Sequence, residues 1–237
     1  MATTLRVESP DGPVPVFETV PDGVARGGVV VVQEAFGVND HIEDVAGRCA
    51  AAGYRAVAPH LYHRSGDQII AYDDIAAVGE PMQQVSEAGL LNDLDAAIGV
   101  LSAAGVDPSR IGVVGFCMGG SVTVLAAARR RLGAAVTFYG GGVVQGRFGM
   151  PPLVELAAEL VTPWLGLYGD LDASIPVDQI IALEAAATRA AVETEVVRYA
   201  DAGHGFHCDA RPGSYHQPSA VDGWRRTLDW FDRHLAG

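Results

Sequence analysis

The sequence predicts a single α/β domain over residues 1–237, with one mostly parallel, twisted sheet and helices on both of its faces. Three observations support this prediction. Apolar, β-branched runs alternate with helical patterns along the chain, which is typical of a parallel sheet with right-handed crossovers. Hydrophobic residues make up 49% and charged residues 19% of the chain, as in a globular protein. No repeat, low-complexity tract or linker divides it.

The strands are predicted from short apolar runs that are bounded by turn residues. The turn-rich segment P-D-G-V-A-R-G separates the first two runs, and Pro59 follows the third. The fourth run, I-G-V-V-G-F, is uninterrupted, as expected for a strand that is buried on both faces. The predicted strands are 14–20, 28–32, 54–58, 111–116, 134–139, 164–168 and 195–199.

The helices are predicted from apolar positions that recur three and four residues apart. Leu94, Ile98 and Leu101 mark one face of such a helix, and Gly53 ends the helix before it. The predicted helices are 40–52, 92–104, 121–131, 177–191 and 220–234. The remaining irregular segments, 63–90 and 141–160, are expected to be loops that overhang the ends of the strands.

Composition and charge limit the cellular locations and the binding partners that are expected for this protein. The formal net charge of −13 disfavours nucleic acid and anionic membranes, and the absence of lysine excludes Schiff-base chemistry. The first residues lack the apolar core of a signal peptide, and three scattered cysteines do not suggest a disulfide framework. We expect a cytoplasmic monomer or homodimer that acts on a small molecule without a cofactor, nucleic acid or membrane.

Residues 111–120, I-G-V-V-G-F-C-M-G-G, are the most informative stretch of the chain. An apolar strand leads through Gly115 into Cys117, and Gly119 follows two positions later. This spacing is typical of a nucleophile elbow, whose sharp turn requires small residues on both sides. The turn puts the sulfur at a helix N-terminus, where partial positive charge favours the thiolate. Cys117 is therefore a candidate nucleophile, the alternative being a buried cysteine in a glycine-rich turn.

An elbow nucleophile needs a base and an acid that orients the base, in the chain order nucleophile, acid, histidine. The segment Y-G-D-L-D-A-S-I-P follows a predicted strand and offers Asp170 and Asp172. The segment Y-A-D-A-G-H-G-F-H follows the next strand and offers His204, flanked by glycines. Because Asp170 is typical of a turn directly after a strand, Asp172 is the favoured acid.

Four separated motifs of the chain resemble the dienelactone hydrolase family, which has the α/β-hydrolase fold and a cysteine nucleophile. They are V-V-V-V-Q-E-A-F-G, G-F-C-M-G-G, G-D-L-D-A-S-I-P and A-G-H-G-F-H. The resemblance covers almost the whole length of the chain and preserves the order of the motifs. It implies that Cys117, Asp172 and His204 are the family's catalytic cysteine, aspartate and histidine.

The resemblance also assigns residues around the nucleophile. Glu34 corresponds to the glutamate of the family's Q-E-x-x-G segment, which lies near the nucleophile and helps to control the protonation of the thiol. A charged residue at the end of a buried strand is in any case unexpected unless it meets a partner, caps the next helix or faces water. The oxyanion hole would be formed by the backbone N–H groups of Ala35 and Met118.

Substrate recognition is where the chain departs from the family. Well-known members hold the carboxylate of the substrate with two arginines, but Cys208 stands at one of these positions and residues 66–90 contain no basic side chain. The sequence therefore predicts that neutral esters or lactones are better substrates than carboxylate-bearing ones, because an unpaired buried carboxylate is costly. This holds unless Arg64, Arg147 or Arg211 replaces the family's arginines.

Three residues are predicted to contact the substrate. Tyr139 ends a strand on the expected active face, Phe206 follows His204 closely, and Arg64 lies in a loop after a strand. Packing would be the commoner role for a buried tyrosine, and solvation the commoner role for a loop arginine.

A cysteine nucleophile limits the reaction. A thiolate, with a thiol pKa of about 8.5, leaves a tetrahedral intermediate more easily than an amine or an alkoxide does. The chain is therefore predicted to be a carboxylic-ester hydrolase for activated esters or lactones, acting through a thioester acyl-enzyme. The alternative is a protein of the same fold without hydrolytic turnover that uses Cys117 as a ligand-binding or redox-sensing thiol.

Two groups of histidines with nearby Asp or Cys residues are possible metal sites by residue type. His60 and His63 lie near Asp67 in the sequence, and His204, His207 and Cys208 are close together. Neither spacing matches a strong metal-binding motif, so no metal is predicted.

Overall fold

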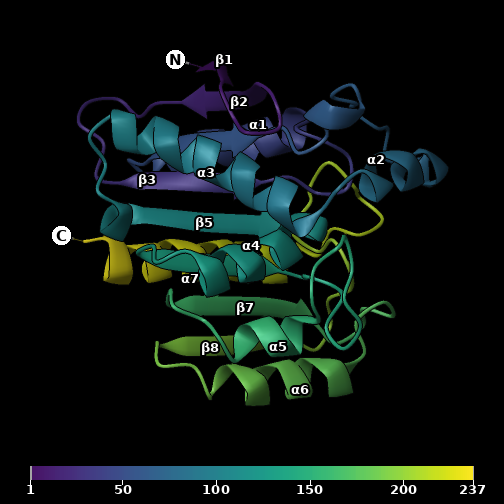
Figure 1. Cartoon of the computed structure of the whole chain (residues 1–237). Helices are drawn as coiled ribbons and strands as arrows, with labels where there is room; N and C mark the ends of the chain where they lie inside the picture. Colours follow the sequence, from purple (N-terminus) through teal and green to yellow (C-terminus); the bar gives the residue numbers. More distant parts are fainter. Residues whose placement is uncertain (1, 237) are drawn as a thin grey trace.

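The computed structural model describes residues 2–236 and contains one eight-stranded sheet in the order β1-β2-β4-β3-β5-β6-β7-β8 (Figure 1). The sheet is antiparallel where β2 meets β1 and β4 and parallel everywhere else. The strands are β1 (Ala2–Val7), β2 (Val14–Thr19), β3 (Gly28–Val32), β4 (Arg55–Pro59), β5 (Ile111–Phe116), β6 (Ala134–Phe138), β7 (Trp164–Gly169) and β8 (Thr194–Tyr199). The predicted fold class, a mostly parallel α/β sheet, is confirmed.

Helices cover both faces of the sheet. In the view of Figure 1, α3, α4 and α6 lie in front of the strands, and α1 and α7 lie behind them. The long helices are α1 (Asp40–Ala51), α3 (Glu87–Ala103), α4 (Met118–Arg129), α6 (Val177–Ala187) and α7 (Gln217–Leu235). The short elements are α2 (Gly79–Gln83), α5 (Leu153–Ala157) and the 3-10 turns η1 (His63–Ser65), η2 (Ile75–Val78) and η3 (Pro108–Arg110).

Local chemistry explains where the main helices begin. The side chain of Asn39 accepts a hydrogen bond from the N–H of Ile42 at the start of α1, and Ser86 does the same for Gly89 in α3. The helix α4 differs, because its N-cap is Cys117 and no side chain caps it. Its free N–H groups therefore remain directed toward the carboxyl ends of the strands, where sheets of this kind bind ligands.

The structure differs from the sequence expectations at one edge of the sheet, at the start of α3 and in the two irregular segments. The strand β1 was not predicted, because its side chains are largely exposed and it only adds an antiparallel edge to β2. Helix α3 begins at Glu87, five residues before the predicted start, because Ser86 supplies the cap. The two segments expected to be loops contain short helices, of which α5 packs against α4 and α6.

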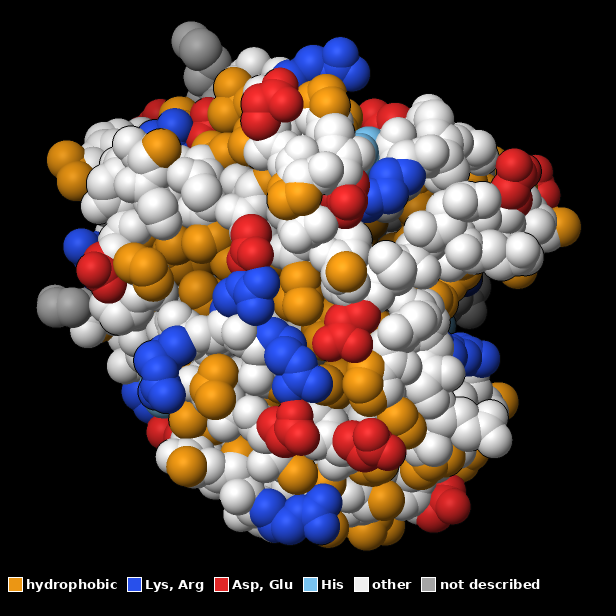
Figure 2. All heavy atoms as spheres, in the orientation of Figure 1, with side chains coloured by type: hydrophobic (Ala, Val, Ile, Leu, Met, Phe, Trp, Pro, Cys, Tyr) orange, Lys and Arg blue, Asp and Glu red, His pale blue; other side chains and the backbone are white. Residues whose placement is uncertain are grey.

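The surface of the described residues carries charges of both signs. In Figure 2 arginines and acidic side chains are interspersed across the visible face, with hydrophobic side chains between them. Among residues 2–236 no helix is both long enough and apolar enough to span a membrane.

One core residue gives the protein a pH-dependent stability. His207 is buried and its ring stacks on Phe116, with 4.9 Å between the ring centroids. Burial, together with the nearby His41, lowers the pKa of His207 to about 3. An unfolded histidine has a pKa of about 6.5, so between these two values only the unfolded chain binds the proton. The contribution of His207 to stability is therefore complete above about pH 6.5 and is lost progressively as the pH falls from there.

Replacing His207 by phenylalanine is expected to reduce this acid sensitivity while keeping the ring in the core. The wild-type free energy of unfolding should decrease by about 1.4 kcal/mol per pH unit between pH 6 and pH 4 through this one group. Urea unfolding at several pH values measures the slope for both proteins. Equal slopes for the wild type and His207→Phe would show that His207 is not the responsible group.

Candidate active site

The elbow between β5 and α4 holds Cys117 in a conformation that is rare for a residue with a side chain, with φ +54° and ψ −114°. Such strain persists only where the surroundings impose it, and it is common at functional sites. Two glycines make the turn possible. A methyl group at Gly115 would collide with the backbone of Gly119, and one at Gly119 would collide with the carbonyl oxygens at the end of β3.

Three side chains from separate loops meet at this elbow. His204 Nε2 lies 3.1 Å from Cys117 Sγ, and His204 Nδ1 lies 2.6 Å from Asp172 Oδ2. Asp172 Oδ1 in turn accepts hydrogen bonds from the N–H and the hydroxyl of Ser174, at 2.8 and 2.6 Å. The structure therefore joins the three predicted residues in a continuous chain from carboxylate to imidazole to sulfur, which we call the Cys–His–Asp cluster.

The charges in this cluster favour a protonated imidazole. Burial opposes a charge on His204, but its hydrogen bonds to Asp172 and Cys117 outweigh burial and raise the pKa of His204 to about 10. Burial would likewise raise the pKa of Asp172, but hydrogen bonds from His204 and Ser174 hold it below its ordinary value. The cluster can therefore keep a proton on His204 next to the sulfur, which is the arrangement that activates a thiol.

The two loop aspartates have different partners in the structure. Asp170 receives two hydrogen bonds from the guanidinium of Arg198, at 2.7 and 2.8 Å. Asp170 directly follows β7, and its partner Arg198 lies in the neighbouring strand β8, as expected for a structural ion pair. Asp172, two residues later, is buried and contacts His204 instead.

Glu34 is buried at the end of β3, and the site provides little to balance its charge. Its Oε1 accepts a hydrogen bond from the hydroxyl of Tyr139 at 3.4 Å, and its Oε2 has no partner among the described protein atoms. Burial raises the pKa of Glu34, while the nearby charges of Arg211 and His204 oppose this shift. Glu34 is thus a carboxyl group that can take up a proton beside the Cys–His–Asp cluster.

One tyrosine contacts both of the residues that were predicted to supply the oxyanion donors. The Tyr62 hydroxyl donates to the carbonyl oxygen of Ala35 at 3.0 Å and lies 3.6 Å from Met118 Sδ. Tyr62 is not among the residues predicted from the sequence, because one tyrosine in a loop after a strand has no recognisable pattern. Its proximity to both residues appears only when β3, β4 and α4 are assembled.

The sequence model of the dienelactone hydrolase family matches residues 14–235 of the chain. The chain belongs to this family. A candidate carboxymethylenebutenolidase of Methylorubrum extorquens is 40% identical over 99% of this chain and 81% of its own length. A candidate lactonase of a Bradyrhizobium species, named for 2-oxo-3-(5-oxofuran-2-ylidene)propanoate, is 30% identical over 88% of this chain and 84% of its own length.

Solved structures agree with this assignment. The crystal structure of a candidate dienelactone hydrolase from Klebsiella pneumoniae has 39% sequence identity and a TM-score of 0.89, and the match covers 98% of each chain. This protein is therefore a hydrolase of the dienelactone hydrolase family with the family's α/β fold, as the resemblance predicted.

Among the predicted substrate contacts of this family member, Arg64 requires a correction. Its guanidinium is held by the buried carboxylate of Asp93 through two bonds of 2.8 Å and by Asp11 at 2.9 Å. His63 also contacts Asp93, at 3.0 Å. Arg64 fixes the loop after β4 and is not free to bind a substrate.

The two predicted aromatic contacts pack together beside the cluster. The ring centroid of Tyr139 lies 5.1 Å from that of His204, so Tyr139 adjoins the Cys–His–Asp cluster. Phe206 is fully buried behind Tyr139, with ring centroids 5.2 Å apart. Phe206 therefore supports Tyr139 and offers no surface of its own to a substrate, which corrects the sequence expectation.

Two arginines remain near the site. Arg211 lies over the rings of Phe36 and Tyr72, at 5.2 and 5.4 Å from their centroids, and is close enough to oppose the pKa shift of Glu34. Arg147 lines a cavity of about 220 Å³ whose wall includes Ser174, the residue that bonds Asp172. The described structure thus places one arginine near Glu34 and another in the cavity that includes Ser174.

The other two cysteines are unsuited to nucleophilic attack. Cys49 and Cys208 are buried, and burial raises the pKa of Cys49 to about 12 and that of Cys208 to about 11. Cys117 is partly exposed. Among residues 2–236 there is no group of three or more His, Cys, Asp or Glu side chains that could hold a metal ion.

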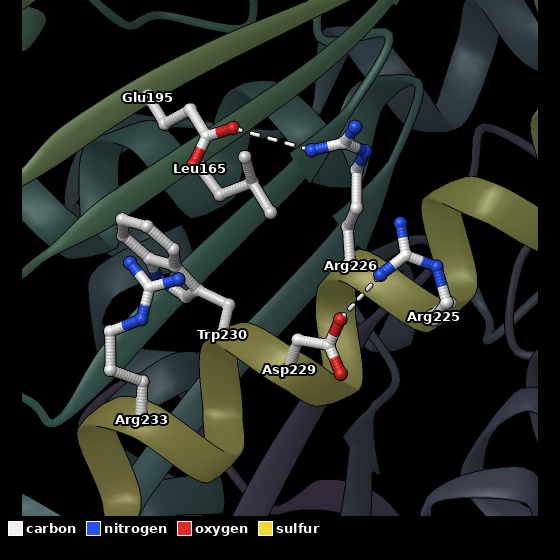
Figure 3. A pocket seen from close by; sticks show the side chains of 7 residues that line it. All are labelled: Leu165, Glu195, Arg225, Arg226, Asp229, Trp230 and Arg233. Atoms are coloured by element: carbon white, nitrogen blue, oxygen red, sulfur yellow. Dashed lines mark hydrogen bonds and ion pairs between the residues drawn. The ribbon is translucent and has the colours of Figure 1, made fainter.

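A separate hollow of about 230 Å³ lies where α7 crosses the sheet (Figure 3). Its arginines are engaged with acidic neighbours, since Arg226 pairs with Glu195 at 3.4 Å and Arg225 with Asp229 at 2.6 Å. It contains no residue of the Cys–His–Asp cluster and no other candidate nucleophile. The candidate catalytic residues thus lie at the elbow and not in this hollow.

Proposed function

We propose that the protein hydrolyses an activated ester or an enol lactone, with Cys117 as nucleophile, His204 as general base and acid, and Asp172 as the group that orients His204. The unbroken chain of short contacts from Asp172 Oδ2 through His204 to Cys117 Sγ carries this proposal. A strained cysteine that touches an imidazole, which itself touches a carboxylate, is the arrangement needed for acyl transfer.

The reaction has two halves. The thiol proton goes to His204, and the sulfur of Cys117 forms a bond to the carbonyl carbon, whose oxygen takes the negative charge. The N–H groups of Ala35 and Met118 bind this oxygen. As the carbonyl re-forms, the bond to the leaving oxygen breaks and that oxygen takes the proton from His204. The thioester is then attacked by water, which gives a proton to His204, and the carboxylic acid leaves as the thiol is restored.

Glu34 is proposed to influence the protonation of Cys117. A carboxyl group with a raised pKa beside the cluster can hold or release a proton as the charge on the sulfur changes. Its contact with Tyr139, whose ring adjoins His204, links Glu34 to the cluster.

The leaving group decides which substrates complete the first half. The sulfur of Cys117 is expelled in preference to a simple alkoxide or an amine, so attack on alkyl esters and amides would reverse. Aryl esters, thioesters and enol lactones have leaving groups that compete with the thiolate. The Bradyrhizobium relative is named as a candidate lactonase for a compound of this last kind.

Arg211 is proposed to bind a carboxylate on the substrate. Its contacts with Phe36 and Tyr72 hold the guanidinium beside the cluster, and it takes the place of the arginines that this chain lacks. The expected preference for neutral substrates depended on the absence of an arginine that could pair with the carboxylate. If Arg211 fills this role, carboxylate-bearing lactones become the favoured substrate class.

Matched substrates that differ only by methylation of the carboxylate test this assignment. For Arg211→Gln, kcat/KM should fall about 10- to 100-fold for the free acid, the size expected for one charge-assisted contact, and change little for the methyl ester. Arg147→Gln is the control. If the loss occurs in Arg147→Gln instead, the carboxylate binds in the cavity beside Ser174. If the wild type prefers the methyl ester, neither arginine is a substrate contact.

A further inference from the structure

The peptide group between Glu34 and Ala35 accepts a hydrogen bond from a buried side chain, that of Gln33. Gln33 has no exposed surface, and its Nε2 donates to the carbonyl oxygen of Glu34 at 3.3 Å. Its Oε1 accepts the N–H of Leu61 at 3.0 Å. The amide of Gln33 therefore fastens the end of β3 to the segment that follows β4.

This contact also sets the direction of the Ala35 N–H. A trans peptide is planar, and its C=O and N–H point in opposite directions. The C=O of Glu34 and the N–H of Ala35 belong to the same peptide, so a hydrogen bond that fixes the first also fixes the second. A hydrogen bond to the carbonyl oxygen additionally polarises the peptide and strengthens its N–H as a donor.

Tyr62 holds the next peptide. Its hydroxyl is buried, donates to the carbonyl oxygen of Ala35 at 3.0 Å and contacts Met118 Sδ at 3.6 Å. One hydroxyl thus touches both residues whose N–H groups are assigned to the oxyanion. Burial raises the pKa of Tyr62, and a charge on Cys117 would raise it further, so the hydroxyl stays protonated and can act as a hydrogen-bond donor.

We propose that Gln33 and Tyr62 are positioning residues that hold the N–H groups of Ala35 and Met118 in the geometry that binds the oxyanion. This inference rests on the proposed function, because it assumes that Cys117 attacks a carbonyl. In this proposal the segment after β4, which contains Leu61 and Tyr62, holds the loop after β3 and the loop after β5 at a fixed separation. Donors that are fixed beforehand stabilise the oxyanion without reorganisation during the reaction.

Tyr62→Phe removes one hydroxyl and keeps the ring, so it tests the proposal with little change in packing. Tyr168→Phe is a matched control, because Tyr168 is also a fully buried tyrosine near the cluster and its hydroxyl has no partner among the described protein atoms. Gln33→Met is a second variant, of similar size but without either hydrogen bond. Thermal unfolding confirms that each variant is folded.

Three measurements separate positioning of the oxyanion hole from other roles. The first is kcat/KM for an aryl ester. The second is the inhibition constant of an aldehyde, to whose carbonyl carbon the Cys117 sulfur adds while the thiol proton passes through His204 to the carbonyl oxygen. The third is the rate of alkylation of Cys117 by iodoacetamide as a function of pH, in which no oxyanion forms.

For Tyr62→Phe and Gln33→Met we expect kcat/KM to fall about tenfold and the aldehyde to bind about tenfold more weakly, less than the loss of a whole donor. The alkylation rate and its pH profile should stay within twofold of the wild type, and Tyr168→Phe should behave as the wild type does in all three measurements.

Two results would overturn the inference. One is a loss in alkylation that parallels the loss in hydrolysis, because Tyr62 would then act on the thiol or on the fold. The other is unchanged hydrolysis and aldehyde binding in both variants. If the wild type hydrolyses no ester but still binds the aldehyde through Cys117, the proposed function fails, while the aldehyde comparison still decides the positioning role.

Discussion

Cys117→Ala is expected to reduce kcat for an aryl ester by a factor of about 10⁴ or more, because residues of a catalytic triad act as a unit and the nucleophile cannot be bypassed. Cys117→Ser should also lose most turnover. His204 Nε2 lies 3.1 Å from the sulfur of Cys117, and the C–O bond of serine is shorter than the C–S bond of cysteine. A hydroxyl is also less acidic than a thiol, so it needs a stronger base for activation. Steady-state hydrolysis of an aryl ester measures both effects.

Cys49→Ala serves as the control for these substitutions. Cys49 is fully buried in α1, and its high pKa keeps it a thiol, so its removal should leave kcat unchanged within about twofold apart from any loss of stability. If Cys117→Ala kept a tenth or more of the wild-type turnover, another group would have to be the nucleophile.

Asp172→Asn is expected to lower kcat by about 10³- to 10⁴-fold, as loss of the orienting carboxylate does in related triads. The amide cannot stabilise a protonated His204 in the way the carboxylate does, and its NH2 group favours the wrong tautomer of the imidazole. The high pKa of His204 depends on Asp172, so in Asp172→Asn this pKa should fall. The pH dependence of kcat/KM measures the shift together with the loss of rate.

Asp170→Asn is the matched control, since it makes the same chemical change two residues earlier. Asp170 pairs with Arg198 on the surface and does not contact His204, so its substitution should change kcat by less than about threefold, the scale of an exposed ion pair. A larger effect for Asp170→Asn than for Asp172→Asn would reverse the assignment of the acid.

The sequence contained enough information to predict the interior of the sheet and the Cys–His–Asp cluster. The strands β3 and β5 coincide with the predicted ranges, because a continuous apolar run next to a glycine-rich turn has few other conformations. Cys117, Asp172 and His204 follow strands that are adjacent or nearly so, and the carboxyl ends of parallel strands meet at one edge.

Contacts that depend on the path of a loop could not be predicted. Arg64 was expected near the substrate, but the buried carboxylate of Asp93 on α3 holds it, and the sequence does not show that these two segments meet. Phe206 was placed at the pocket by its proximity to His204, whereas the turn at Gly205, with φ +77°, directs it behind Tyr139.

Gln33 and Tyr62, which we propose to position the oxyanion hole, were not predicted for a related reason. Gln33 directly follows the apolar strand β3, and Tyr62 lies in an irregular loop, so neither position indicates a function from the sequence alone. The proposed roles rest on hydrogen bonds between residues that are about 30 positions apart in the sequence, such as the one from Tyr62 to Ala35. Pairings of this kind become visible only when the strands are placed side by side.

The central claim is that Cys117 carries the acyl group during turnover. It is tested most directly by mixing the wild-type protein with an aryl acetate, quenching with acid before the steady state, and mapping the acetylated peptide by mass spectrometry. The account predicts one acetyl group, on Cys117, released by hydroxylamine as a thioester is, and absent from Cys117→Ala. An acetyl group on another residue, or hydrolysis at the wild-type rate by Cys117→Ala, would contradict it.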